Sequence, residues 1–257
     1  MSDTVLTDAA AARRALVELL ADAPHVRALV PDAALAQMER YVELLLEANQ
    51  RLNLTRVVAA PEVARLHLLD ALAALPLLDA AAPSRVVDLG SGGGVPALPL
   101  AIARRDVAWT LVDSVGKKAA ALRSFVTELG LPNVEVVAER AELLGRDPAY
   151  RERFSVATAR ACAALPVLAE LALPLVEVGG ALIAWKGPLD ARSPEMVEGA
   201  AAASVLGGGV PRLVASGIDA LGGHSLVVVP KAGATAARFP RRPGEPSRRP
   251  LGRLPHH

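Results

Sequence analysis

The residues best suited to chemistry lie in one glycine-rich stretch. Residues 84–99 read SRVVDLGSGGGVPALP, in which Asp88 begins an Asp-x-Gly-x-Gly-x-Gly pattern. Gly90 and Gly92 permit positive φ angles and carry no Cβ, so a ligand can lie against bare backbone beside a helix N-terminus. The spacing departs from the dinucleotide pattern Gly-x-Gly-x-x-Gly, because Val95 occupies the third glycine position. Such turns also occur as plain corners between a strand and a helix.

A carboxylate stands at the end of the next expected strand. Residues 109–112 form a short apolar run that ends at Asp113 and Ser114. The interval of roughly twenty residues from the glycines places this carboxylate where it can accept hydrogen bonds from a ribose. Asp113 could instead cap the helix that follows, and one carboxylate is able to serve both ends. The two features together favour a cofactor that contains a nucleoside.

Two cationic side chains follow later strands. Arg160 comes after the expected strand 154–158, and Lys186 comes after the expected strand 181–185. Because the carboxyl ends of parallel strands meet at one edge of a sheet, we expect both side chains at the same crevice. A cationic pair there suits a phosphate-bearing substrate, although one of the two could simply neutralise nearby acids.

Strands and helices alternate through the central part of the chain, which predicts an α/β fold with a mostly parallel sheet. The final strands are expected to close the sheet in antiparallel fashion. We also expect a helix over 166–176, followed by a turn at Gly179 and Gly180. The expected strands cover residues 85–89, 109–112, 134–137, 154–158, 181–185, 210–215 and 225–229.

Amphipathic helices precede the first strand and should form a cap on the main fold. Residues 8–22 and 31–49 have helical spacing of apolar residues, and a third helix carries His67 and Asp70. Residues 49–55 are too polar to continue the second helix. For His67 we favour a partly buried histidine bonded to a neighbour, because no nucleophile or second metal ligand lies at suitable spacing.

Composition narrows the class of protein. The chain has 257 residues, of which 52% are hydrophobic and 3% aromatic, and its net charge is +1. Its one cysteine, Cys162, excludes an internal disulfide and a multi-cysteine zinc site. No stretch resembles a signal peptide or a membrane span. We therefore expect a cytoplasmic monomer that binds neither a metal nor a membrane.

The basic charge is concentrated at the end of the chain. Residues 231–257 carry a net charge of +6, which leaves −5 for residues 1–230. Such an arm could attract a phosphate backbone or be a solvated end, and from residue 232 its Pro, Gly and Arg content argues against a packed element. We expect a helical extension over 1–80, a main domain over 81–230 and a basic arm over 231–257.

The order of motifs resembles the bacterial ribosomal RNA small-subunit methyltransferase G family, and the match covers most of the chain. The resemblance implies a class I, Rossmann-like fold that binds S-adenosylmethionine (SAM), and methylation of guanosine 527 at N7 in the 530 loop of 16S rRNA. The motifs that carry it are Asn-Leu-Thr at 53–55, His-Leu-Leu-Asp at 67–70, Val-Asp-Leu-Gly-Ser-Gly at 87–92, residues 111–117, 158–161 and 184–187, and Phe-Pro-Arg-Arg-Pro-Gly-Glu-Pro at 239–246.

The resemblance also implies positions for the cofactor and the substrate. Arg160 and Lys186 become candidates for positioning the substrate, and no catalytic residue is certain. The implied cofactor residues are Gly90, Gly92 and Val95 against the cofactor, Asp113 and Ser114 at its ribose, Ala141 and Glu142 beside its adenine, and Arg160 in the crevice. The chain departs from the family at Val95, where phenylalanine is usual, at Ala97, where glycine is usual, and at Ala71, where serine is common.

The sequence lacks two devices that other nucleic-acid methyltransferases use, and methylation of guanine N7 needs neither of them. Methylation of pyrimidine C5 needs a cysteine that attacks the ring, whereas we interpret Cys162 as a buried filler. Methylation of exocyclic amines often uses an Asn/Asp-Pro-Pro-Tyr/Phe motif, but residues 159–162 read Ala-Arg-Ala-Cys. Two alternatives remain open, an NAD-linked oxidoreductase and a non-catalytic RNA-binding protein on the same fold.

Overall fold

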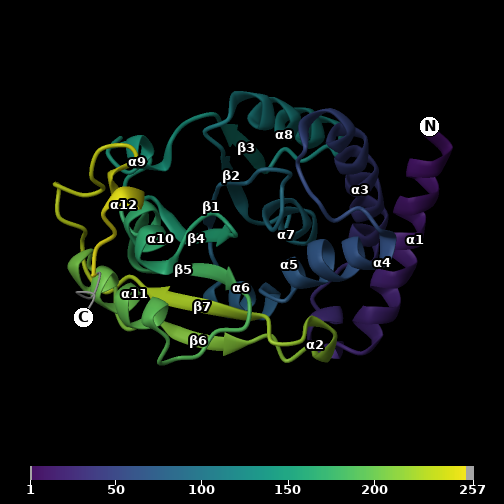
Figure 1. Ribbon diagram of the computed structural model, residues 1–257. Coiled ribbons are helices and arrows are strands. Elements are labelled where there is room, and N and C mark those ends of the chain that lie inside the picture. Colours follow the sequence, from purple (N-terminus) through teal and green to yellow (C-terminus); the bar gives the residue numbers. More distant parts are fainter. Residues whose placement is uncertain (1, 253–257) are drawn as a thin grey trace.

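One seven-stranded sheet organises the computed structural model, which describes residues 2–252 (Figure 1). The strands lie in the order β3-β2-β1-β4-β5-β7-β6, and β7 runs in the opposite direction to the other six. The expected α/β sheet, mostly parallel with an antiparallel closing strand, is confirmed. The strands are β1 (Arg85–Leu89), β2 (Ala108–Val112), β3 (Val134–Val137), β4 (Phe154–Arg160), β5 (Val176–Lys186), β6 (Arg212–Ala215) and β7 (Ser225–Pro230).

The strand order reverses direction between β1 and β4. Successive strands move outward from β1 through β2 to β3, and the chain then returns to place β4 on the other side of β1. At such a reversal the loops after the two central strands diverge, which leaves a crevice at the carboxyl ends of the strands. The glycine-rich stretch follows β1 and Arg160 ends β4, so both lie at this crevice.

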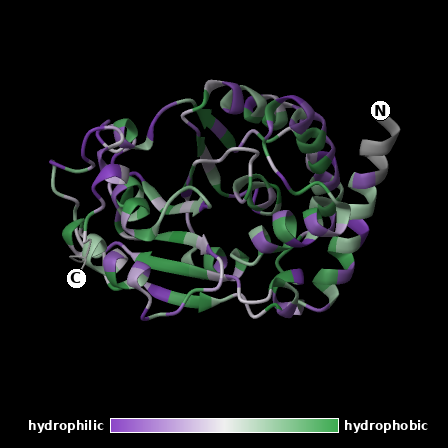
Figure 2. Cartoon of the chain, viewed as in Figure 1, coloured by the Kyte–Doolittle hydropathy of each residue, from purple (hydrophilic) through white to green (hydrophobic). Residues whose placement is uncertain are grey.

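Each face of the sheet has its own apolar core, because neighbouring strand residues point to opposite faces. Val86 belongs to one core and Val87 to the other. Figure 2 shows the central strands mostly in the hydrophobic colour, with both colours on the surrounding helices. The helices after β1 are α7 (Ala97–Ala103), α8 (Gly116–Glu128), α9 (Ala141–Leu144), α10 (Leu165–Ala172), α11 (Pro194–Val205), the 3₁₀ helix η2 (Asp219–Leu221) and α12 (Glu245–Arg248).

The helices that precede β1 form an added layer against α7 and α8. Tyr41 from α3 is completely buried and donates a hydrogen bond to the carbonyl of Gly93 at 2.8 Å, so this layer holds the glycine turn from behind. Among the described residues no helix is long and apolar enough to cross a membrane. The layer consists of α1 (Ser2–Ala21), α2 (Pro24–Arg27), α3 (Asp32–Leu52), α4 (Ala60–Val63), the π-helix η1 (Ala64–Leu69), α5 (Asp70–Leu72) and α6 (Leu75–Ala81).

Three local predictions are wrong. The helix expected over 166–176 is α10, which ends at Ala172, and Val176 already belongs to β5. Helix α3 continues to Leu52 despite its polar sequence, and Asn49 at its end accepts a hydrogen bond from the N–H of Thr55 at 2.8 Å. The chain does not turn at Gly179 and Gly180, because β5 runs through both glycines beside a register shift against β4. Gly180 serves close packing there, since its Cβ would lie 2.3 Å from the carbonyl oxygen of Ser155, whereas Gly179 has open space around it and a φ of +95°.

The expectation that nothing packs after residue 232 is also wrong for the described residues. Residues 232–252, called here the C-terminal strap, run beside α9 and α10 and are coloured yellow in Figure 1. Phe239 is 5% exposed and joins the second core. The guanidinium of Arg151 donates to the carbonyls of Thr235 at 2.6 Å and Phe239 at 2.7 Å, and Arg146 donates to that of Pro240 at 2.8 Å. Residues 253–257 of the predicted arm lie outside the described residues.

Gly180→Ala should destabilise the protein by about 1–3 kcal/mol, because the new methyl group would overpack the backbone between β4 and β5. Urea unfolding followed by circular dichroism measures the change. The matched control is Gly233→Ala, whose Cβ would meet nothing within 4 Å. Equal midpoints for the two variants would show that β5 does not pass so close to Ser155.

Candidate functional site

The turn after β1 is held by hydrogen bonds to the end of β2. The N–H groups of Gly90 and Ser91 both donate to the carbonyl of Val112, at 2.9 and 3.1 Å. Gly90 and Gly92 have φ angles of +71° and +54°, a region that glycine enters without strain. The sequence pattern therefore produces a turn with exposed backbone at the crevice.

Asp113 links this turn to the start of α8. Its Oδ2 accepts from the N–H of Gly92 at 2.9 Å, and its Oδ1 accepts from the N–H of Val115 at 2.8 Å. The side chain is thus both a turn anchor and a support for the next helix. Each carboxylate oxygen can accept a second hydrogen bond, so Asp113 keeps capacity for a ligand hydroxyl.

A cavity of about 390 Å³ lies over the turn, and we call it the glycine cavity. Six of the eight predicted cofactor residues line it: Gly90, Asp113, Ser114, Ala141, Glu142 and Arg160. Gly92 is not part of the lining and reaches the cavity only through its bond to Asp113. Val95 packs against the first core instead. The volume is within the range of ordinary small-molecule sites.

The wall of the glycine cavity at Gly90 favours glycine, because a side chain there would be crowded and the φ of +71° would strain it. A Cβ on Gly90 would lie 3.0 Å from the Cβ of Cys162, which lines the same cavity. Cys162 is exposed, so its interpretation as a buried filler is wrong. The surrounding cavity wall and the Asp88 carboxylate raise the pKa of its thiol to about 11. The thiol is therefore protonated at neutral pH and is a poor nucleophile.

Asp88 lies directly behind the turn and is completely buried. Its Oδ1 accepts from the hydroxyl of Thr158 at 2.7 Å, whereas its Oδ2 is buried without any hydrogen-bond partner. Burial raises the pKa of this carboxyl to about 6, and the bonds from Ser91 and Thr158 oppose the rise. A buried acceptor without a partner is unusual in a folded protein and marks a place that a ligand donor could complete.

A second cavity of about 360 Å³ adjoins the first, and we call it the arginine cavity. Arg160 and Ala161 line both cavities. The remaining lining residues are Val57, Leu66, Asp70, Trp185, Lys186, Gly187 and His224. Lys186 therefore lies at the arginine cavity and not at the glycine cavity. Arg160 and Lys186 meet at the arginine cavity, as the predicted cationic pair requires.

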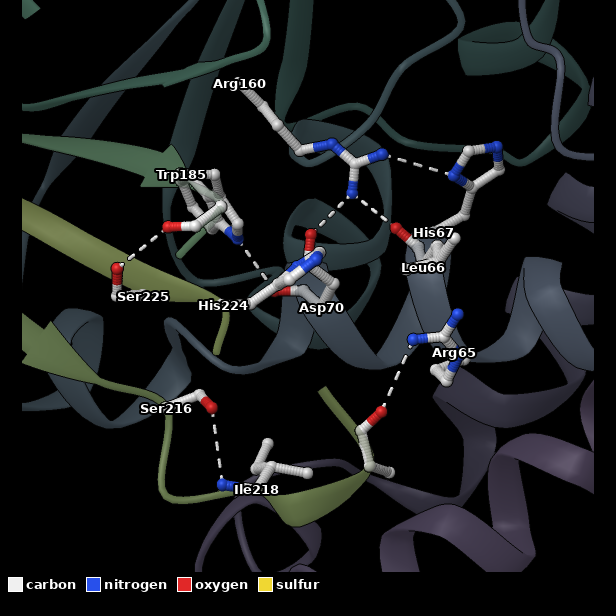
Figure 3. Close-up of polar contacts among 12 residues, drawn as sticks. Arg65, Leu66, His67, Asp70, Arg160, Trp185, Ser216, Ile218, His224 and Ser225 are labelled. Atoms are coloured by element: carbon white, nitrogen blue, oxygen red, sulfur yellow. Dashed lines mark hydrogen bonds and ion pairs between the residues drawn. The ribbon is translucent and has the colours of Figure 1, made fainter. Parts of the chain in front are cut away.

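Arg160 connects the end of β4 to the helical layer, as Figure 3 shows. Its Nη1 donates to the carbonyl of Leu66 and, at 2.8 Å, to Oδ2 of Asp70. Its Nη2 lies 3.3 Å from Nδ1 of His67. The carboxylate of Glu142 accepts from the N–H of Gly244 and not from Arg160. Of the alternatives for this cation, neutralising a nearby acid is the one that the structure shows.

His67 is a buried histidine bonded to its neighbours, as predicted. Its Nε2 lies 2.8 Å from the hydroxyl of Thr55, and its Nδ1 faces the N–H of Arg160. Because arginine can only donate, Nδ1 must accept, and the proton of the neutral ring therefore sits on Nε2. Burial and the Arg160 charge lower the pKa of His67 to about 4.

The remaining charges at the arginine cavity are also paired. Lys186 donates to Glu195 at 2.7 Å and to the carbonyl of Ala163 at 3.0 Å. Asp70 accepts from Arg160, and its Oδ1 lies 3.1 Å from Nδ1 of His224. Among the described residues no cluster of three or more His, Cys, Asp or Glu side chains could hold a metal ion.

Sequence reasoning missed two residues of this cavity. Trp185 donates its indole N–H to the carbonyl of Asp70 at 2.7 Å, and His224 contacts the Asp70 carboxylate. Both flank the place where β5 and β7 meet, since Trp185 pairs with Leu226. Trp185 could have been found because it lies near the carboxyl end of β5. His224 is harder to find, because β7 is antiparallel and brings its amino end, not its carboxyl end, to the crevice.

Comparisons with known proteins agree on one family. A family model described as GidB, rRNA small subunit methyltransferase G, matches residues 34–216. A protein named ribosomal RNA small subunit methyltransferase G from Pelotomaculum thermopropionicum is 40% identical over 224 residues, which are 87% of this chain and 93% of the relative. A protein of the same name from Deinococcus deserti is 44% identical over 219 residues, covering 84% of this chain and 88% of the relative.

Solved structures support the fold. A putative O-methyltransferase from Klebsiella pneumoniae superposes with a TM-score of 0.51 at 17% identity, covering 83% of this chain and 97% of the other. A methyltransferase from Geobacter sulfurreducens gives a TM-score of 0.50 at 16% identity, over 81% and 96% of the two chains. The predicted class I methyltransferase fold is confirmed.

The neutral state of His67 predicts a loss of stability in acid. The pKa is lowered on folding, so the unfolded chain takes up the proton first, and stability falls as the pH drops from about 6.5 toward about 4. The difference in pKa corresponds to roughly 3 kcal/mol. In His67→Gln the loss of stability that comes from protonation of His67 should be absent from the pH dependence of the free energy of unfolding.

Urea titrations at several pH values measure this dependence. The matched control is His25→Gln, because His25 is exposed. If the parent and His67→Gln lost stability in parallel between pH 6.5 and 4, the neutral and acceptor role of His67 would be contradicted.

Proposed function

Because the chain belongs to the rRNA small subunit methyltransferase G family, we propose that it transfers a methyl group from SAM to N7 of guanosine 527 in 16S rRNA. The target lies in the 530 loop, and the partner is the small ribosomal subunit or its RNA. The observation that carries the proposal is the pair of adjoining cavities that share Arg160, one with a bare glycine wall and one lined by paired charges. Family membership also removes the oxidoreductase alternative.

The residues of the glycine cavity fit SAM. Gly90 offers bare backbone where a Cβ would lie in tight contact with Cys162, and Asp113 has free acceptor capacity for a ribose hydroxyl. The buried Oδ2 of Asp88 lacks a donor but does not line the cavity, so the ammonium group of the aminoacyl end would reach it through a bridging water. The residues proposed to hold the cofactor directly are Gly90, Asp113, Ser114, Ala141, Glu142 and Arg160. Gly92 would act through its bond to Asp113, and Val95, which packs against the first core, would support the turn from behind.

Methylation of guanine at N7 needs no general base from the protein. The lone pair of N7 is free in the neutral base, so no group needs to remove a proton before the methyl group is transferred. When bound, SAM would supply the methyl group in electrophilic form on its sulfonium. The contribution of the chain is to align the two reactants and exclude water, which is worth about 7–11 kcal/mol in the best cases.

The charge pairs of the arginine cavity are compatible with a positively charged cofactor in the adjoining glycine cavity. A free guanidinium beside a sulfonium would be repelled in a site of low dielectric constant. Asp70 compensates Arg160, and Glu195 compensates Lys186, so neither cation presents an unpaired charge. We propose that Arg160 and Lys186, held in place by Asp70 and Glu195, position the guanosine through hydrogen bonds.

The proposal is tested by mapping N7-methylguanosine in 16S rRNA after incubation of small subunits from a strain that lacks this methyltransferase with purified protein and SAM. We expect one new modification, at position 527. Gly90→Ala should abolish it, because the added methyl group enters the glycine cavity. Gly130→Ala is the matched control, since Gly130 has a similar φ of +56° but its Cβ would meet nothing within 4 Å.

Each alternative has its own outcome. Methylation at another nucleotide or atom would refute the proposed target but would still show that the protein is a methyltransferase. Binding of 16S rRNA without any methylation by a protein that also fails to bind SAM would favour the non-catalytic RNA-binding alternative.

A further inference from the structure

The C-terminal strap is fixed to the main fold by a buried ion pair. Glu170 on α10 has a completely buried side chain, and Arg241 of the strap donates to it from three nitrogens. The backbone N–H and Nε of Arg241 lie 2.8 and 2.9 Å from Oε1, and Nη2 lies 2.5 Å from Oε2. A buried carboxylate is stable only when it is compensated in this way, so Arg241 is strongly held at α10.

Beyond Arg241 the strap reaches the glycine cavity. The N–H of Gly244 donates to Oε1 of Glu142 at 2.8 Å. Glu142 is only 7% exposed and lines the glycine cavity, and Ser247 of the strap lines it as well. Gly244 has a φ of +78°, which lets its N–H turn toward α9 without strain. The strap therefore both orients a cavity carboxylate and supplies part of the wall.

We propose that residues 242–249 form a wall of the cofactor site, and that they raise the affinity for SAM by fixing Glu142 and closing that end of the glycine cavity. This inference rests on the proposed function, because it takes the glycine cavity as the place where SAM binds. It gives the basic arm a role that its composition does not suggest, since net charge alone points to RNA.

The coupling must act in both directions. If the docked strap improves SAM binding, then bound SAM must stabilise the docked strap by the same factor. The affinity for SAM and the protection of the strap are therefore two independent measurements of the same coupling free energy. Neither measurement requires the methyl transfer reaction.

The first experiment is titration calorimetry with SAM on a chain that ends after Arg241. This truncation removes the contacts of Gly244 and Ser247 but keeps the Arg241–Glu170 pair, so the buried carboxylate stays compensated. The matched control ends after Gly252 and retains every described strap contact. We expect the first truncation to weaken SAM binding by about 5- to 150-fold and the second to leave it unchanged.

The second experiment uses the full chain and does not depend on the folding of a truncated one. Trypsin can cut the bond between Arg248 and Arg249, which are both exposed. Saturating SAM should slow this cut at least about fivefold. The bond between Arg192 and Ser193 is the internal control, because Arg192 is exposed and neither residue lines the glycine cavity.

The outcomes separate this inference from the proposed function. A parent chain that binds no SAM would overturn both. A parent that binds SAM, with equal affinity in the chain ending after Arg241 or an unchanged rate of cleavage at Arg248, would overturn the strap inference alone. Weaker binding together with protection at Arg248 supports it.

Discussion

The guanidinium of Arg160 joins the end of β4 to the helical layer that precedes the sheet, and the arrangement of the site depends on this junction. It bonds to the carbonyl of Leu66 and to the carboxylate of Asp70, and it faces the neutral ring of His67. Asp70 is 5% exposed, so removing Arg160 would leave a nearly buried charge without its partner. The same side chain separates the two cavities, because it lines both. One ion pair thus holds two layers of the fold and defines the boundary of the site.

The parts of the fold and site that the sequence predicted are those that local patterns determine. Alternating strands and helices predicted the sheet, and the glycine turn with Asp113 at the next strand end predicted the crevice, because both depend on neighbouring residues. Three features depend on distant partners and were missed. The strap packs because Arg241 meets Glu170, 71 positions earlier. Cys162 lines a cavity formed by several segments and is exposed there, and β5 requires a glycine at position 180 because the backbone of Ser155 in β4 lies close. The contacts of His224 with Asp70 span 154 positions.

Electrostatic pairing distinguishes the two cavities. In the arginine cavity the cations are compensated, since Arg160 bonds to Asp70 and Lys186 to Glu195. In the glycine cavity the carboxylates of Asp113 and Glu142 accept hydrogen bonds from backbone N–H groups. The first arrangement offers oriented donors and acceptors for a base, and the second offers bare backbone and acceptors for a nucleoside with a cationic sulfur. This contrast is the basis of our proposal that cofactor and target base occupy adjoining spaces on either side of Arg160.

A crystal structure of the protein with S-adenosylhomocysteine and guanosine monophosphate tests this proposal most directly. The account predicts the cofactor product in the glycine cavity, with its ribose at Asp113 and its adenine beside Glu142, and the guanine in the arginine cavity with N7 directed toward the sulfur. Density for the cofactor product in the arginine cavity, or for the guanine on a surface remote from Arg160, would contradict it.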